Sequence, residues 1–144
     1  MINTGELELG NTVYVDEKLT STENNLRGTV IGIEADKVKV RVKDIELTCL
    51  FSQIYPVPLF RSEFINLGFV PRSIKTASEE KQDLVLSIET DRTWYLLEIT
   101  EVDSFLTVKK EGRIVEGSGI VKTLHQLQNM VNQITRGIIK IEGL

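Results

Sequence analysis

The sequence has one cysteine, one histidine and one tryptophan among its 144 residues, and this scarcity excludes several kinds of chemistry. A single cysteine cannot form an internal disulfide. One histidine and one cysteine cannot supply the four ligands of a structural zinc site without two carboxylates. No apolar run approaches the roughly 20 residues that a membrane-spanning helix needs. We therefore predict a protein with no metal site, no cofactor and no membrane segment.

Composition and charge are those of an ordinary folded chain. Hydrophobic residues make up 41% and charged residues 26% of the sequence, which argues against disorder over most of its length. The first residues, MINTGELELG, lack the basic start and apolar stretch of a secretion signal. The net charge of −4 gives no overall positive field that would attract nucleic acid or an anionic membrane. We expect a soluble, cytoplasmic protein.

The first third of the chain alternates short β-branched runs with turn residues. TVYV (12–15) predicts a strand and the polar stretch 16–27 a long loop. The segment 29–51 predicts three strands separated at Ala35-Asp36 and Lys43-Asp44, with Cys49 buried in the last of them. A fifth extended piece follows at 53–58. This pattern predicts a small, strongly bent β-barrel of the Tudor or KOW kind over residues 1–57.

The remainder, residues 58–144, has the pattern of an α+β unit. Phe60, Phe64 and Leu67 recur at helical spacing before Gly68, which predicts a short helix. Four β-rich runs then predict an antiparallel sheet: DLVLSIE, TWYLLEIT, SFLTVKK and RIVEG. Near the end, apolar residues at spacings of three and four predict a helix that packs against this sheet, and IIKIE (138–142) predicts a short closing strand. The predicted fold class is therefore α+β, with the two parts packed together.

The two faces of the second predicted sheet differ in composition. One face collects the apolar residues that the last helix is expected to cover: Leu84, Leu86, Ile88, Tyr95, Leu97, Ile99, Leu106 and Val108. The other carries Trp94, Leu96 and Phe105 among polar residues. Two interpretations are open for this second face. The short helix of residues 60–67 covers it, because large exposed apolar patches are uncommon on monomers, or Trp94, Leu96 and Phe105 anchor another protein.

The strand KVKVRVK is the most basic stretch of the chain. Its cations are expected to project from one face, about 7 Å apart, where they could follow phosphates: Lys37, Lys39, Arg41 and Lys43. The alternative is a solvated face whose charge is neutralised across strands and turns by acidic neighbours: Glu34, Asp36, Asp44 and Glu46. We favour the solvated face, because this strand lacks the aromatic residues that would stack bases.

The last predicted helix carries the only histidine, in the stretch TLHQLQNMVNQITRG (123–137). A nucleophilic triad would need His125 as its base, with a serine and an acid brought close by the fold. On a helical wheel His125 lies with Asn129 and Asn132 beside the apolar stripe, which is typical of a histidine that hydrogen-bonds at a helix edge. Thr123 and Gln126 fit a capping box at the start of the helix. We predict no catalytic residues and no enzyme activity.

Two stretches carry a resemblance. IYPVPLFRSEFINLGF (54–69) and VKTLHQLQNMVNQITRG (121–137) resemble small uncharacterised proteins encoded by bacteria of the Bacteroidetes group and by their phages and mobile elements. Those proteins have an N-terminal β region, a proline-flanked helix that ends in Gly-Phe, and a late helix with HQLQN. The resemblance implies this fold and no particular activity. We interpret its polar residues as a hydrogen-bonded helix flank that fixes the fold: His125, Gln126, Gln128 and Asn129.

These features favour a non-enzymatic binding or regulatory protein of phage or mobile-element type. It is expected to act through protein–protein contacts, with a protein partner or by self-association, at the face of Trp94, Leu96 and Phe105. A nucleic-acid-binding small barrel that uses the basic strand 37–43 is the alternative.

Overall fold

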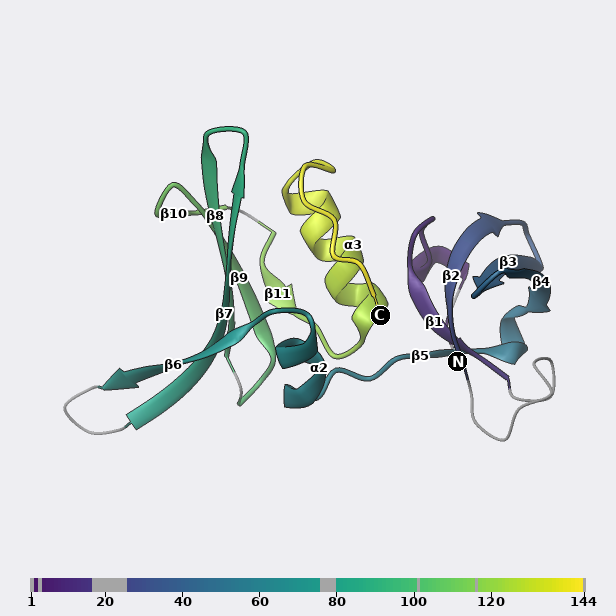
Figure 1. Cartoon of the computed structure of the whole chain (residues 1–144), viewed down its shortest axis with the longest axis horizontal. Coiled ribbons are helices and arrows are strands. Elements are labelled where there is room, and N and C mark those ends of the chain that lie inside the picture. Colours follow the sequence, from purple (N-terminus) through teal and green to yellow (C-terminus); the bar gives the residue numbers. More distant parts are fainter. Residues whose placement is uncertain are drawn as a thin grey trace. The chain divides into compact units, whose positions relative to one another are not determined.

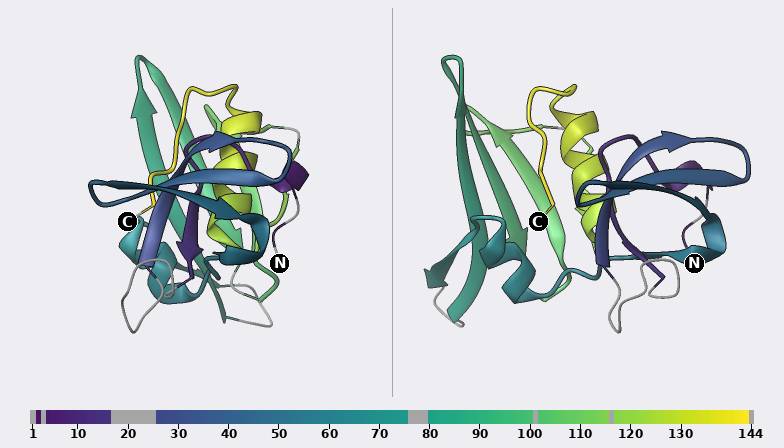
Figure 2. Two further views of the ribbon diagram at one scale, coloured as in Figure 1. Left: turned by 90° about the vertical axis from the view of Figure 1, so that its right-hand side faces the viewer. Right: turned by 45° about the vertical axis from the view of Figure 1, so that its right-hand side comes forward.

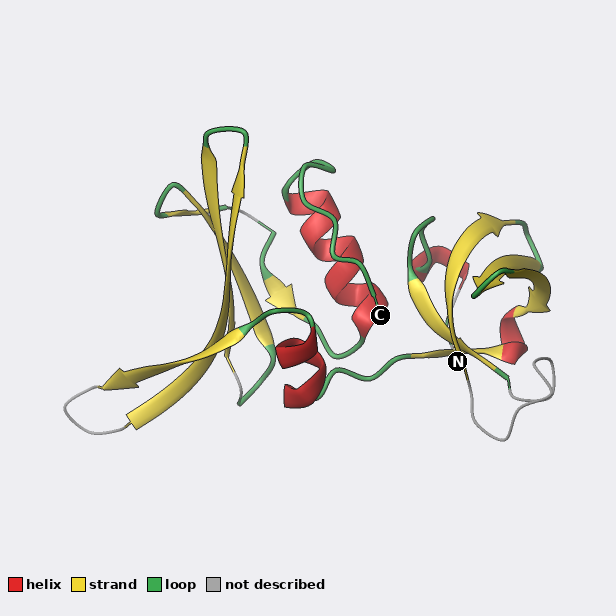
Figure 3. Cartoon of the chain, viewed as in Figure 1, coloured by secondary structure: helices red, strands yellow, loops and turns green. Residues whose placement is uncertain are grey.

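The computed structural model describes residues 2, 4–16, 26–75, 80–100, 102–115 and 117–143. The chain divides into two compact units, and neither is one consecutive segment. The first comprises Met1–Pro58, Thr123–Asn129 and Ile141–Leu144, and the second comprises Leu59–Lys122 and Met130–Lys140. Two antiparallel sheets and a C-terminal helix make the fold α+β, as predicted (Figure 3). None of the described helices is long and apolar enough to cross a membrane.

The first unit contains a five-stranded antiparallel sheet in the order β4-β3-β2-β1-β5. Its elements are η1 (Thr4–Glu6), β1 (Thr12–Val15), β2 (Leu26–Ile33), β3 (Lys37–Val42), β4 (Ile45–Leu50), η2 (Phe51–Gln53) and β5 (Ile54–Pro56). These strands curve strongly (Figure 2). Among the described residues, no pairing between β4 and β5 closes this curved sheet, so it is open, and the barrel of the Tudor or KOW kind stays a prediction.

Alternation of apolar and charged residues decides which side of the first sheet is buried. In β3, Val38, Val40 and Val42 are buried and the cations between them are exposed, because successive side chains of a strand point to opposite faces. The same core contains Ile2, Leu7, Val13, Val15, Val30, Cys49 and Ile54. Cys49 is thus a core residue, as predicted, and burial raises the pKa of its thiol.

The turns of this sheet agree with the sequence pattern, with two corrections. Ala35-Asp36 and Lys43-Asp44 separate β2, β3 and β4 as predicted. Lys43 has a φ of 55° and belongs to the turn, so it does not continue the basic face of β3. The loop predicted over 16–27 falls mostly on residues 17–25, which lie outside the described residues, and its last two residues already belong to β2.

The second unit contains a sheet in the order β10-β9-β8-β7-β6, and β11 also pairs with β9. Its elements before the last helix are α2 (Arg61–Asn66), β6 (Val70–Lys75), β7 (Glu80–Thr90), β8 (Thr93–Thr100), β9 (Phe105–Lys110), β10 (Arg113–Ile114) and β11 (Gly119–Ile120). β7 and β8 form a long hairpin (Figure 1). β6 was not predicted. It contains Pro71, and proline within sheets is found mainly on edge strands, of which β6 is one.

Helix α2 packs on the apolar face of the second sheet, which is the face that contains Leu84. Phe64 of α2 lines a hollow together with Leu84 and Ile99, and Arg61 donates a hydrogen bond to Gln82 on the same side of β7. The interpretation that this helix covers the face of Trp94 is therefore wrong. The reason is local: the Leu59 N–H donates to the Lys122 carbonyl at 3.0 Å, which ties the start of α2 to the segment after β11.

Gly68 ends α2 as predicted. Its φ of 103° is a backbone conformation that glycine adopts without steric cost. The Gly68 N–H donates to the Ile65 carbonyl and the Phe69 N–H to the Phe64 carbonyl, each at 3.0 Å, which is the Schellman pattern. The rings of Phe64 and Phe69 then pack edge to face, with centroids 5.4 Å apart. This motif directs the chain into β6.

Helix α3 spans Leu124–Ile134, and its residues are divided between the two units after Asn129. The Thr123 N–H donates to Gln126 Oε1 at 3.3 Å, which is one half of the predicted capping box. In the second unit, Met130 and Ile134 lie next to Gly119 and Gly117, so this half of the helix packs beside β11.

The chain after α3 does not form the strand predicted for residues 138–142. Instead of pairing with a strand, its backbone hydrogen-bonds to the side chains of Gln128 in α3 and of Thr135, the residue that follows α3. The Ile139 N–H donates to the Thr135 hydroxyl at 3.1 Å, and the Ile141 carbonyl accepts from Gln128 at 3.0 Å.

Candidate functional site

Gln128 hydrogen-bonds two distant parts of the first unit. Its Oε1 accepts from the Thr12 N–H at 2.8 Å, and its Nε2 donates to the Thr12 hydroxyl at 3.2 Å and to the Ile141 carbonyl at 3.0 Å. The side chain is buried. Because a buried backbone group left without a partner costs about 1–3 kcal/mol, Gln128 stabilises both the start of β1 and the C-terminal segment.

Asn129 extends this polar contact to the residues before β1. Its Nδ2 donates to the Glu6 carbonyl at 2.6 Å, and its Oδ1 accepts from Asn11 Nδ2 at 2.6 Å. Asn11 in turn accepts from the Glu8 N–H at 2.8 Å through its Oδ1. The predicted polar flank of the helix is therefore a chain of hydrogen bonds within the first unit, whereas Gln126 is exposed and caps Thr123.

His125 is 1% exposed and both of its ring nitrogens have a partner. Nε2 lies 3.3 Å from Glu6 Oε2, and Nδ1 lies 3.2 Å from the Thr123 hydroxyl. These partners fit the neutral tautomer with its proton on Nε2, which donates to the carboxylate while Nδ1 accepts from the hydroxyl. Burial lowers the pKa of His125, and the hydrogen bond and charge of Glu6 partly oppose that shift.

Thr123, His125 and Glu6 have the connectivity of a nucleophile, a base and an acid. A base in catalysis must exchange its proton with a substrate group within hydrogen-bond reach. His125 has almost no accessible surface through which a leaving group could approach. The cluster is thus arranged to hold the start of α3 against η1, which contains Glu6.

A second candidate site is the sheet face that contains Trp94 and both of its predicted neighbours. Registered pairs place on this face the apolar residues Val70, Val85, Trp94, Leu96, Phe105, Ile114 and Ile120. We call it the Trp94 face. Trp94 is 53% and Ile114 68% exposed, Leu96 is half-buried, and Val70, Phe105 and Ile120 are exposed. This concentration of exposed apolar side chains contrasts with the buried face on the other side of the same sheet.

Four charged residues cross the Trp94 face in a diagonal row, which sequence reasoning missed. Arg72 contacts Asp83 at 3.3 Å and Glu98 at 3.1 Å, and Lys109 contacts Glu98 at 3.0 Å. The acidic side chains are only 10% and 14% exposed. Their sequence spacing alone carries no signal, because only the register of β6 to β9 makes them neighbours.

A third candidate is the outer face of the first sheet. Lys37, Lys39 and Arg41 are exposed there as predicted. Of the acidic neighbours expected to neutralise them, Glu46 pairs with Arg41 at 3.4 Å, with both side chains more than half exposed. Such an exposed pair contributes little. Sequence reasoning missed the aromatic residues of this face, because they come from other strands.

Those aromatic residues are Tyr14 of β1 and Tyr55 of β5, which are directly paired. Tyr14 is also paired with Arg27 of β2, whose guanidinium lies 5.6 Å from the centre of the Tyr14 ring. The register of β2 with β3 puts Arg41 opposite Thr29, two residues along from Arg27, so these side chains share the outer face. The face thus combines cations with two rings.

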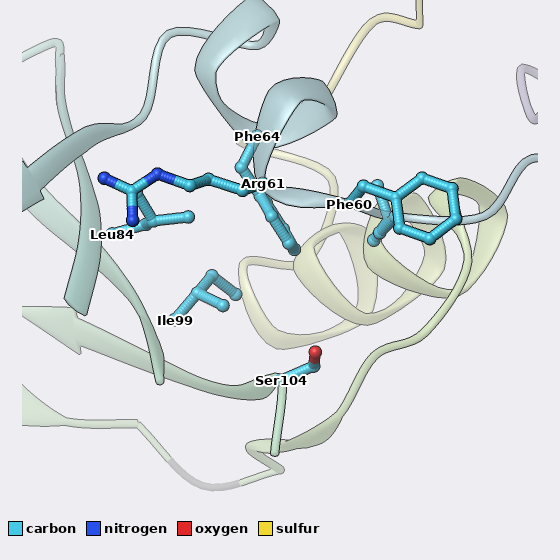
Figure 4. A pocket seen from close by; sticks show the side chains of 7 residues that line it. Phe60, Arg61, Phe64, Leu84, Ile99 and Ser104 are labelled. Carbon is cyan, nitrogen blue, oxygen red and sulfur yellow. The ribbon is translucent and has the colours of Figure 1, made fainter. Parts of the chain in front are cut away.

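A hollow of about 260 Å³ opens beside α2 in the second unit (Figure 4). Its lining residues are Leu59, Phe60, Arg61, Phe64, Leu84, Ile99 and Ser104. In Figure 4 the side chains of Phe64, Ile99 and Ser104 surround the same space. The volume lies below the roughly 300–1,000 Å³ of small-molecule sites, so the hollow suits an apolar side chain better than a substrate.

Within the described ranges, no three His, Cys, Asp or Glu side chains gather where a metal ion could bind. Comparisons with protein-family models, with curated proteins and with solved structures find no match. The function must therefore be argued from the surfaces of the two units.

Replacing Gln128 with methionine keeps the side-chain volume and removes its hydrogen bonds. We expect the Gln128→Met variant to lose about 1–3 kcal/mol of unfolding free energy, because the buried Thr12 N–H and the partly buried Ile141 carbonyl lose their partner. Gln126→Met is the matched control on the same helix and should lose about 0.5 kcal/mol, since its bond is exposed. Urea unfolding of both variants measures the difference. Equal losses would contradict the structural role of Gln128.

The stability of the chain should depend on pH through His125. Because burial lowers the pKa of this residue in the folded state, the unfolded chain binds the proton first as pH falls below about 6.5. Stability should therefore decrease as pH falls from about 6.5 to the lower folded pKa, and the decrease should be smaller in His125→Gln. NMR titration of the single imidazole measures its pKa directly. A folded pKa at or above about 6.5 would mean that Glu6 outweighs burial.

Proposed function

We propose that this chain is a non-enzymatic protein-binding module that docks on another protein through the Trp94 face. The observation that carries the proposal is the exposure of large apolar residues from five strands on one sheet face. Exposed apolar patches on soluble chains mark interaction sites more often than chance. Tryptophan and phenylalanine are also favoured anchors of interfaces.

Trp94, Leu96 and Phe105 are the proposed anchors. A hollow of about 180 Å³ beside Trp94 gives a partner side chain a place to insert, and its lining residues are Ser87, Trp94, Tyr95, Leu96, Lys109 and Gly112. Hot spots of interfaces are typically residues packed around such hollows. The backbone of Trp94 is held in place, because its N–H donates to Glu111 Oε1 at 2.7 Å. The anchor thus stands on β8, a strand that is paired with β7 and β9.

The proposed barrel class and the proposed phage or mobile-element type rest on the first unit and on the sequence motifs. The strand order β4-β3-β2-β1-β5, with the single turn η2 between β4 and β5, supports placing this unit among small bent barrels of the Tudor or KOW kind. The HQLQN and Gly-Phe motifs support a regulatory protein of phage or mobile-element type. Such a protein would act in the cytoplasm.

Site-specific photocrosslinking tests the proposed face. A photoreactive residue at Thr107, in the middle of the Trp94 face, should give discrete protein adducts in cells that naturally make the chain. The adducts should disappear in a Trp94→Ala, Phe105→Ser variant that keeps its circular dichroism. A photoreactive residue at the exposed Ser62 of α2 is the control and should give none of them. Absence of adducts from Thr107, or the same adducts from Ser62, would refute the proposed face.

The second candidate function is weak binding of single-stranded nucleic acid by the outer face of the first sheet. The observation that favours it is the row Tyr55, Tyr14 and Arg27 beside the cations of β3. Rings that stack on bases, next to cations that contact phosphates, are the elements of single-strand binding. The net charge of −4 opposes it, so this candidate ranks second.

Titration of labelled oligonucleotides at several salt concentrations tests this second function. Contacts from Lys37, Lys39 and Arg41 to three phosphates of a single strand would give a log–log salt slope of about −2. We expect binding at low salt only, weakened by Tyr55→Ala and abolished by Lys39→Glu with Arg41→Glu. Tight binding at physiological salt that these changes abolish would put this function first. No binding at low salt would remove it.

A further inference from the structure

Four charged residues in the middle of the Trp94 face balance one another. Arg72 and Lys109 supply two positive charges, and Asp83 and Glu98 supply two negative charges. Three ion pairs of 3.0 to 3.3 Å connect all four residues. Glu89, which is paired with Trp94 at the hairpin end of the face, is exposed and lies outside this row. Away from that end, the described charges of the face are paired with one another.

The same ion pairs lower the cost of covering this face. The carboxylates of Asp83 and Glu98 are already mostly withdrawn from water, at 10% and 14% exposure. Burying a charge is costly mainly when it lacks a partner, and here each carboxylate keeps its cation. Covering the face would consequently remove apolar side chains from water without separating Asp83 or Glu98 from its cation.

The edge strand β6 does not favour a partner that extends the sheet. Pro71 has no N–H, so it cannot donate to an added strand, and proline is one of the features that protect edge strands from such pairing. A partner of the second unit is therefore expected to cover the face and not to prolong the sheet.

We propose that the occupant of the Trp94 face is a second copy of this chain, related by a two-fold axis, so that two Trp94 faces pack on each other. This inference rests on the proposed function and specifies its partner. A two-fold contact needs a self-complementary surface, and an apolar face whose four central charges are paired with one another meets that condition. Each exposed apolar residue of the face is then buried in both copies of the chain.

The size of the face fits a weak, reversible dimer. The face extends roughly 20 Å along β8 and roughly 20 Å across the strands, from the usual rise and spacing of strands. Two such faces would cover on the order of 800 Å² in flat projection, and more once side chains interdigitate, which approaches the roughly 1,200 Å² at the low end of specific interfaces. The dimer should therefore dissociate on dilution.

Sedimentation velocity over a range from low micromolar to near-millimolar concentration tests the dimer, with Trp94 fluorescence recorded on the same samples. Trp94 is the only tryptophan and lies on the proposed interface. The sedimentation coefficient should rise with concentration toward that of a dimer, and the Trp94 emission should shift to shorter wavelength in parallel. Ile114→Glu and Phe105→Ser should each keep the chain monomeric over this range.

Ile45→Glu is the matched control, because Ile45 is 63% exposed on β4 of the first unit and Ile114 is 68% exposed on the face. It should dimerise like the unchanged chain. A dimer that all three variants weaken equally, or not at all, uses another surface and overturns the inference. A chain that stays monomeric with water-exposed Trp94 emission also overturns it but leaves the proposed function with a different partner. Monomers whose Trp94 is already shielded at the lowest concentration refute both.

Discussion

The structure of the first unit depends on two amide side chains of α3, Gln128 and Asn129. They form hydrogen bonds with backbone groups of other segments. Gln128 bonds the start of β1 and the C-terminal segment, and Asn129 bonds the chain at Glu6. Segments more than 110 residues apart in sequence are thus joined by single side chains. Because these bonds satisfy one buried and two partly buried backbone groups, removing one costs more than an ordinary surface hydrogen bond. This constraint explains why the helix is polar on one flank and carries no acidic residue.

His125 belongs to the same polar contact, because it and Asn129 both hydrogen-bond Glu6. Its two nitrogens are engaged by the Glu6 carboxylate and the Thr123 hydroxyl, and the ring has almost no exposed surface. A buried, fully paired histidine fixes a helix start and makes the contact sensitive to protonation. Both described contacts of the only histidine thus lie within the first unit.

The two faces of the sheet in the second unit differ, because one is covered and the other is exposed. One face buries its apolar residues under α2 and beside the second half of α3. The Trp94 face carries exposed apolar residues around a neutral row of ion pairs. Since α2 is tied by Leu59 and Lys122 to the buried face, no described element of the second unit covers Trp94. Because of this topology, a chain of ordinary hydrophobicity exposes an apolar face that is a candidate interface.

The sequence by itself determined the local structure. Period-two alternation fixed β3 and β8, the Gly68 stop ended α2, and the spacing of Leu124, Leu127 and Val131 predicted α3, because these signals depend only on neighbouring residues. Only the tertiary structure decided which elements meet. The side chosen by α2, the strand β6, the lack of a strand after α3 and the ion-pair row at Glu98 all follow from strand register and long-range hydrogen bonds. Sequence spacing does not encode these contacts, since each joins segments whose separation the local pattern leaves open.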